Sequence, residues 1–269
     1  RRPSATPLRI LGVPLRLFAA WPVDLLPTLY AFDSALSPFA SPADTAVIRS
    51  TCDRLLAEQV GREAGDHFDL SGQSKNLKMA ALPQIMNPSK YVPELSELGY
   101  RRQACSLAEL LLGPDITLLN EHMIMKPAFH GGQTPWHQDQ AYHDPGLIYT
   151  NVNIWLALAD ATIENGCMQY VPGSHKMDVL PHHPIGHNPQ AVGLEVDQPQ
   201  QYAAQAKVCP VSAGGVVVHR SYMLHYAGPN QTDRCRPAYV LVYGCEPRRR
   251  ARSLNFSWLT GRHDGVKTS

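Results

Sequence analysis

Residues 151–158 read NVNIWLAL, a stretch in which large apolar residues alternate with other side chains. Val152, Ile154, Leu156 and Leu158 share one face if the stretch is extended, because successive side chains of a β-strand point to opposite faces. We therefore predict a strand here, with that face buried against a core.

Further short strands are predicted after this stretch, at 167–171, 216–220 and 238–243. Turn-forming residues separate them, including Asn165-Gly166 and Gly214-Gly215. Several short strands with Gly- and Pro-rich turns, following a helical start, are typical of a β-sandwich or jelly roll with helices packed outside. The predicted fold class is mainly β with flanking helices.

Two helices are predicted before the strands. The first covers about 42–59, because Ser41 is a good N-cap and Pro42 suits the first helical position. The second is short: it begins at the capping box that starts with Ser106, and it ends at Gly113, which Pro114 follows.

The whole chain, 1–269, is interpreted as one domain. Residues 1–115 form a mainly helical N-terminal part, although 61–104 is polar and irregular. Residues 116–247 form the β core. The long segment 175–208, rich in His, Pro and Gln, is a possible lid inserted into that core.

Charge and cysteine content exclude several classes of protein. The chain has 24 Lys+Arg and 23 Asp+Glu, for a formal net charge of +1, which argues against nucleic acid as a partner. Its six cysteines lie far apart without a CxxC pair, a pattern that suits a reducing cytosol. We expect a cytoplasmic protein; the sequence does not specify its oligomeric state.

The segment from Leu8 to Phe32 is apolar enough to be tested as a membrane span. Arg9, Arg16 and Asp24 interrupt it, so no uncharged run of the length that a membrane helix needs remains. We expect no membrane association.

Histidines concentrate in the β half, where the strongest candidate site lies. In the sequence TPWHQD, residues 134–139, His137 and Asp139 are two apart and face the same way on an extended segment. His225, 88 residues downstream, is a candidate third ligand. Two histidines and one carboxylate suit a non-haem iron, but zinc accepts the same ligands, so a Zn-dependent hydrolase remains the alternative.

Arg236 lies at the start of the predicted strand 238–243. A guanidinium that points into a barrel needs an anionic partner. That partner is either an internal carboxylate or a dicarboxylate co-substrate that chelates the metal with its other end.

These features follow one another in a recognisable order. The ordered motifs are HQD at 137–139, Trp155, ENGCMQYVPGSH at 164–175, His225 and Arg236. They resemble the phytanoyl-CoA dioxygenase family over about residues 30–245. That family comprises Fe(II)- and 2-oxoglutarate-dependent oxygenases built on a double-stranded β-helix.

The resemblance implies roles for individual residues. It makes His137, Asp139 and His225 the Fe(II) ligands, and it places Arg236 against the distal carboxylate of 2-oxoglutarate. The other residues that it assigns to the co-substrate site are Trp155, Gln138, Lys78 and His122.

One position departs from the family pattern. Ala227 stands where the family often has a serine hydroxyl for the distal carboxylate. Tyr226 or Tyr239 could replace that hydrogen bond, or Arg236 could act alone.

Other candidates come from position alone. Tyr142 and His143 follow the first ligands closely, so we expect them to line the substrate pocket. The histidines of 182–187 could form a second metal site, but the flanking prolines favour an exposed loop. His219 is interpreted as a hydrogen-bonded histidine beside the core.

The sequence as a whole predicts a dioxygenase that uses Fe(II), 2-oxoglutarate and O2. It would hydroxylate an unactivated C–H bond of a small molecule, with release of succinate and CO2. Besides the Zn-dependent hydrolase, the alternative is a cupin-like barrel that binds ligands without turnover.

Overall fold

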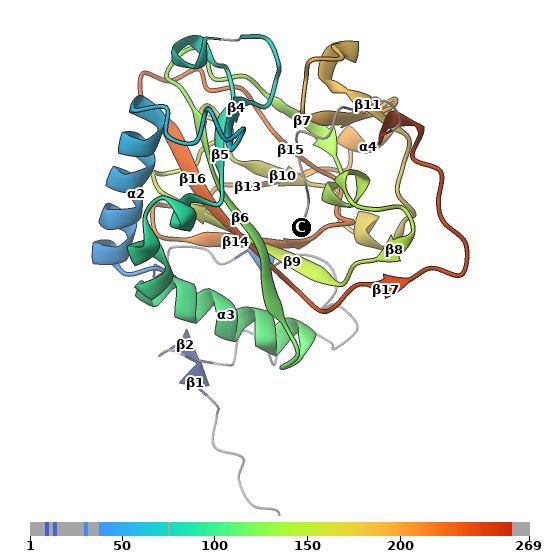
Figure 1. Cartoon of the computed structure of the whole chain (residues 1–269), viewed down its shortest axis with the longest axis horizontal. Coiled ribbons are helices and arrows are strands. Elements are labelled where there is room, and N and C mark those ends of the chain that lie inside the picture. Colours follow the sequence, from blue (N-terminus) through green and yellow to red (C-terminus); the bar gives the residue numbers. More distant parts are fainter. Residues whose placement is uncertain (1–8, 11–12, 15–29, 32–37, 75, 260–269) are drawn as a thin grey trace, which may run out of the picture.

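The structure is a computed structural model that describes residues 9–10, 13–14, 30–31, 38–74 and 76–259. Two antiparallel sheets form its body (Figure 1). In sheet order, the strands of the larger sheet are β3 (Tyr30–Ala31), β14 (Val216–Arg220), β9 (Asn151–Ala157), β16 (Arg236–Gly244), β6 (Thr117–Lys126), β5 (Pro83–Met86) and β4 (His67–Asp69). Those of the smaller sheet are β13 (Lys207–Cys209), β10 (Met168–Tyr170), β15 (His225–Ala227) and β7 (Thr134–His137).

In the part of the chain that the structure describes, three two-stranded pairs and three α-helices accompany these sheets. The pairs are β1 (Arg9–Ile10) with β2 (Val13–Pro14), β8 (Leu147–Ile148) with β17 (Arg248–Arg249), and β11 (His182–Pro184) with β12 (Leu194–Val196). The helices are α2 (Pro42–Ala57), α3 (Gly99–Leu112) and the single turn α4 (Gln200–Ala203).

The central strands β9 and β16 of the larger sheet are buried on both faces. Ile154 and Leu156 of β9 pack into a core shared with α2 and α3, which lie along the outer face (Figure 1). Trp155 and Ala157 point the other way, into a second core shared with the smaller sheet. This arrangement confirms the predicted class, mainly β with flanking helices. Two facing antiparallel sheets also agree with the expected jelly roll.

The strand predictions agree closely with the structure. The predicted strand 216–220 coincides with β14, and the one predicted at 151–158 ends one residue earlier, at Ala157. The prediction at 238–243 lies inside the longer β16, and the prediction at 167–171 contains β10.

Helix α2 forms as its cap predicts. The side chain of Ser41 accepts a hydrogen bond from the backbone N–H of Asp44 at 3.0 Å, and Pro42 opens the helix. The helix ends at Ala57, two residues before the predicted end.

Helix α3 begins at Gly99, seven residues before the predicted start at Ser106, so the capping-box interpretation was wrong. The first turn is held by another helix, because Asp44 Oδ2 accepts from the backbone N–H of Tyr100 at 2.6 Å. The Tyr100 side chain is fully buried in the core beneath the sheet. The predicted end is correct: Gly113 is the C-cap, with φ of 98°.

The segment 61–104, interpreted as irregular, contains β4, β5 and the start of α3. The two strands have three and four residues, too few to show periodicity. Pairing of β5 with β6 and of β4 with β5 stabilises them at the edge of the larger sheet.

The segment 175–208 contains the β11–β12 hairpin and α4. Its role as a lid stays a prediction, as does the division at 115/116. None of the helices that the structure describes has the length and apolar character that a membrane crossing requires. Most of the segment 8–32 lies outside the described residues.

A buried polar network ties α3 to the larger sheet on its outer face. Glu121 of β6 accepts hydrogen bonds from the Arg101 guanidinium, from the Tyr239 hydroxyl, and from the hydroxyl and backbone N–H of Ser89. Only 2% of Glu121 is exposed. A charge that is withdrawn from water in this way is stable only with its partners in place.

We expect Glu121→Ala to lower the free energy of unfolding by about 3–5 kcal/mol, because it leaves a buried guanidinium and two hydroxyls without their acceptor. Urea unfolding followed by circular dichroism measures this loss. Glu58→Ala is the matched control, because Glu58 pairs with Arg54 on the exposed surface of α2, where such pairs contribute about 0–1 kcal/mol. Equal losses in the two variants would contradict the prediction.

Candidate functional site

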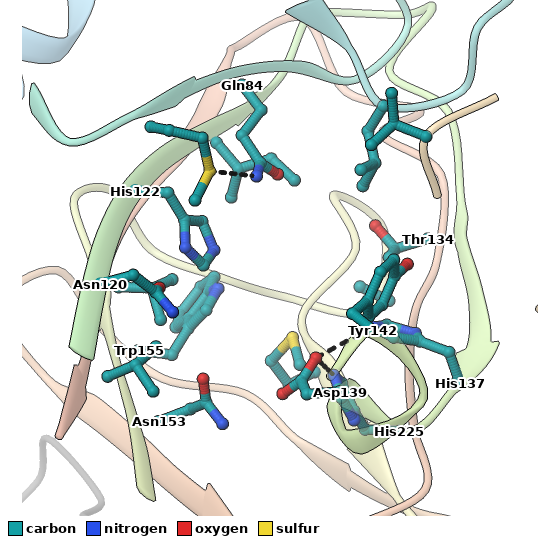
Figure 2. Close-up of a pocket in the computed structure, with 18 of the residues that line it drawn as sticks. Gln84, Asn120, His122, Thr134, His137, Asp139, Tyr142, Asn153, Trp155 and His225 are labelled. Carbon is teal, nitrogen blue, oxygen red and sulfur yellow. Dashed lines mark hydrogen bonds and ion pairs between the residues drawn. The ribbon is translucent and has the colours of Figure 1, made fainter. Parts of the chain in front are cut away.

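The three predicted ligands converge between the sheets. His137 ends β7, and His225 begins β15 directly opposite it in the antiparallel register. Asp139 follows two residues after His137, and the ligand atoms of the three residues all lie within 4.8 Å of one another. Asp139 Oδ1 is 3.4 Å from His137 Nε2 and 3.6 Å from His225 Nε2. Figure 2 shows the three side chains pointing toward one another at one wall of a pocket.

Backbone carbonyls orient both imidazoles. Nδ1 of His137 lies 2.8 Å from the carbonyl oxygen of Pro135, and Nδ1 of His225 lies 2.8 Å from that of Met223. A carbonyl only accepts, so each Nδ1 carries the proton and each Nε2 keeps its lone pair. Both lone pairs then face the space beside Asp139, as metal ligands require.

The charges of the cluster suit a divalent cation. Burial alone would raise the pKa of the Asp139 carboxyl, but the neighbouring imidazoles of His225, His137 and His219 hold it well below its usual range. Burial, reinforced by His137, lowers the pKa of His225 well below its usual range. The donor set is one carboxylate with neutral imidazole, which fits Fe(II) as well as Zn(II).

His219 belongs to the site, which the sequence interpretation missed. Its Nε2 lies 3.1 Å from Asp139 Oδ2, and its Nδ1 lies 3.1 Å from the Tyr170 hydroxyl. Alternation on β14 correctly turned His219 away from Val216 and Val218. It could not reveal that this face of β14, whose Val217 packs in the second core, brings His219 against Asp139.

Arg236 and Trp155 line the same pocket. The guanidinium lies over the Trp155 ring, 5.2 Å from its centroid, and Nε donates to the carbonyl oxygen of Asn165. Only 2% of Arg236 is exposed, and its Nη1 has no hydrogen-bond partner among the described residues. Burial lowers the pKa of Arg236 to about 10, which still leaves it a cation at neutral pH. This buried, incompletely paired cation is a fitting receptor for a carboxylate.

His122, Tyr142 and His143 also line the pocket. His122 stands on the wall opposite the ligands (Figure 2), and burial lowers its pKa to about 4, so it is neutral. The Tyr142 hydroxyl accepts a hydrogen bond from the backbone N–H of Leu194 at 2.7 Å. That bond joins β12 of the possible lid to the pocket wall.

Gln138 and Lys78 do not reach the pocket. The Gln138 amide donates to the Tyr222 carbonyl at 2.9 Å and accepts from the Leu180 N–H at 2.8 Å. The Gln138 side chain therefore points away from the pocket, on the side opposite to His137 and Asp139, as strand alternation predicts. The register irregularity between β7 and β15 lies before His137, so it does not change the direction of Gln138. Lys78 is exposed on a 3₁₀ turn. The buried lysine beside Arg236 is Lys126.

The histidines of the β11–β12 hairpin do not form a second ligand cluster. Within the described residues, the only group of three or more metal-ligating side chains is that of His137, Asp139 and His225. His183 instead bridges Glu195 at 2.7 Å and Asp197 at 2.6 Å. His182 is buried and accepts a hydrogen bond from the backbone N–H of Gln138.

The phytanoyl-CoA dioxygenase (PhyH) family matches residues 34–238, and the chain belongs to that family. It is 28% identical over 159 residues to a phytanoyl-CoA dioxygenase of Arabidopsis thaliana, covering 57% of this chain and 48% of that protein. The chain thus spans about half the length of this curated relative. A "probable alpha-ketoglutarate-dependent hypophosphite dioxygenase" of Stutzerimonas stutzeri is 25% identical over 214 residues, 77% of this chain and 73% of that protein.

Solved structures extend the similarity. EvdO2 from Micromonospora carbonacea var. aurantiaca is 38% identical, with a TM-score of 0.71 over 83% of this chain and 90% of that one. Its complex with 2-oxoglutarate gives 37% identity and a TM-score of 0.70 over the same shares of the two chains.

His182 makes the fold sensitive to acid. Burial lowers its pKa to about 4, whereas an exposed histidine takes up a proton near pH 6.5. The unfolded chain therefore binds more protons between these values, and the native state loses stability as pH falls. From pH 7.5 to 5.0 we expect His182 to account for a loss of ~2 kcal/mol. Urea unfolding of wild type and His182→Gln measures it; losses of equal size in both proteins would refute the prediction.

His219 should position the Asp139 carboxylate. Loss of a side chain that orients a metal ligand typically weakens metal binding about 10- to 100-fold. We expect His219→Leu to do so, and His219→Gln, which keeps an N–H donor, to lose less. Anaerobic calorimetric titration with Mn(II) measures the affinity. His130→Leu, on the exposed surface, is the control and should leave it unchanged; an unaltered affinity in His219→Leu would exclude the role.

Proposed function

We propose that this chain is an Fe(II)- and 2-oxoglutarate-dependent dioxygenase that hydroxylates an unactivated C–H bond of a small molecule. The observation that carries the proposal is the pairing of two features in one pocket. A His–Asp–His cluster stands at one wall, and the lining also holds a buried Arg236 with an N–H that is unpaired among the described residues. The similar EvdO2 has been solved in complex with 2-oxoglutarate, which supports a 2-oxoglutarate site in this chain.

The chain would hold the metal by one face. His137, Asp139 and His225 would bind Fe(II) through two Nε2 atoms and a carboxylate oxygen, which leaves the opposite face for the co-substrate and O2. When bound, iron and 2-oxoglutarate supply the oxidising chemistry, with succinate and CO2 as co-products. His219 holds the second oxygen of Asp139, so the carboxylate is restricted to one orientation.

The other residues would bind and orient. Arg236 would form charge-assisted hydrogen bonds with the distal carboxylate of 2-oxoglutarate, and Trp155, stacked on it, limits how the guanidinium can move. Tyr142 and His143 would contact the substrate. The apolar lining excludes water from the reacting C–H bond; it includes Phe68, Leu70, Met86, Val192, Val240 and Val242.

Two alternatives are less well supported. A Zn-dependent hydrolase would use the same three ligands but has no need of a buried arginine without a carboxylate partner. A barrel without turnover has no need of the complete ligand set. The small-molecule substrate, the exclusion of nucleic acid and the cytoplasmic location are part of the proposal; they rest on the pocket, the near-neutral charge and the cysteine pattern.

Anaerobic visible spectroscopy tests the proposal. Fe(II) and then 2-oxoglutarate are added to metal-free protein, and a weak charge-transfer band that requires both is expected. The band should be lost in His225→Ala, which removes a ligand, and in Arg236→Met at equal 2-oxoglutarate, because the co-substrate loses its cationic partner. Arg249→Met is the matched control, since Arg249 is exposed on β17. Absence of the band in wild type, with tight Zn(II) binding instead, would contradict the proposal.

A further inference from the structure

Two buried basic side chains, Arg236 in the pocket lining and Lys126 beside it, have no carboxylate partner among the described residues. Arg236 appears in none of the ion pairs found among residues 38–74 and 76–259. Beside it, Lys126 is fully buried, and its Nζ donates to the Gly132 carbonyl, to Thr134 Oγ1 at 3.3 Å and to the Ala227 carbonyl at 3.4 Å. An anion bound beside Arg236 would meet the charge of its guanidinium, whose Nη1 has no hydrogen-bond partner among the described residues and so has a proton to donate.

Neither tyrosine considered from the sequence can supply a hydroxyl to that anion. The Tyr239 hydroxyl donates to Glu121 on the outer face of the larger sheet, toward the helices. The Tyr226 hydroxyl donates to Gln133 at 3.1 Å in an exposed position, and its ring stacks on Trp136 at 5.2 Å between centroids. Both hydroxyls therefore already donate to acceptors outside the pocket.

Thr134 places a hydroxyl where Ala227 has none. The two residues face each other across the β7–β15 pair, and both line the pocket together with Arg236. Figure 2 shows Thr134 at the cavity wall, on the same side as His137 and Tyr142. Because Thr134 Oγ1 accepts from Lys126, its own proton points elsewhere, and the pocket is the space available to it.

We propose that Thr134 donates its hydroxyl proton to the distal carboxylate of 2-oxoglutarate, beside Arg236, with Lys126 orienting that hydroxyl. This inference rests on the proposed function. It assigns the distal carboxylate two donors from different sheets: Arg236 from the larger sheet and Thr134 from the smaller one. Thr134 is a binding residue for the co-substrate, with no part in metal ligation.

Anaerobic binding titrations of the Mn(II)-loaded protein test the proposal without turnover. The probes are 2-oxoglutarate and 2-oxopentanoate, which carries a methyl group in place of the distal carboxylate. We expect T134V, which keeps the shape of the side chain, to raise the Kd for 2-oxoglutarate about 10- to 100-fold, the worth of a hydrogen bond to a charged group. The Kd for 2-oxopentanoate should not change. T134S, the matched control, should stay within about threefold of wild type, and A227S added to T134V should recover affinity.

The outcomes separate the two levels of inference. If wild type binds 2-oxoglutarate no better than 2-oxopentanoate, the proposed function itself fails. If wild type discriminates between them but T134V binds both as wild type does, the Thr134 assignment is overturned. Equal weakening of both probes in T134V, or a loss in T134S as large as that in T134V, also overturns it, because the effect would then arise from packing.

Discussion

The burial of β9 and β16 on both faces is the constraint on which the structure depends. Along each strand, alternate side chains pack into the core shared with α2 and α3, and the side chains between them face the smaller sheet and the pocket. Ile154 packs against the helices, and its neighbour Trp155 faces the pocket. The same division separates two kinds of buried polar group. Glu121 belongs to a network that ties α3 to the sheet, whereas the adjacent His122 lines the pocket. One strand thus stabilises the fold with one face and forms the site with the other.

Buried charge is handled differently at the two ends of the pocket. At the ligand end, Asp139 is surrounded by three imidazoles: His219 hydrogen-bonds to its Oδ2, whereas its Oδ1 faces the Nε2 atoms of His137 and His225 and remains available to a cation. Elsewhere in the lining, Arg236 lies beside Lys126 without an acidic partner among the described residues, and burial lowers the pKa of both groups. A buried guanidinium is costly unless a ligand carries the opposite charge. The pocket lining therefore combines a carboxylate among imidazoles with a separate buried cation, which suits a molecule with a metal-chelating end and a distal carboxylate.

The sequence predicted the strands and the ligand triad because both depend on local pattern: alternation along β9, the two-residue spacing of His137 and Asp139, and the ordered motifs shared with a family. It failed where a distant contact decides the outcome. The start of α3 is held by Asp44 from another helix. His219 was placed on the correct face of its strand, but only the packing of the two sheets brings that face to Asp139. Gln138 was assigned to the co-substrate site by resemblance, although strand alternation places its side chain on the side opposite to His137 and Asp139, away from the pocket.

Gln138 joins the metal ligands to the β11–β12 region mechanically. It sits between two ligands in the chain, and its backbone and side chain bond to His182, Leu180 and Asp178. The segment cannot leave the barrel without breaking these bonds and loosening the short stretch that carries both ligands. Any interaction that orders residues 137–139 therefore makes release of the segment 175–208 less favourable. Conversely, the hydrogen bonds from the packed segment help to order His137 and Asp139. If the segment moves as the predicted lid, thermodynamic reciprocity requires that cation binding by the ligand cluster and closure of the segment favour each other to the same extent.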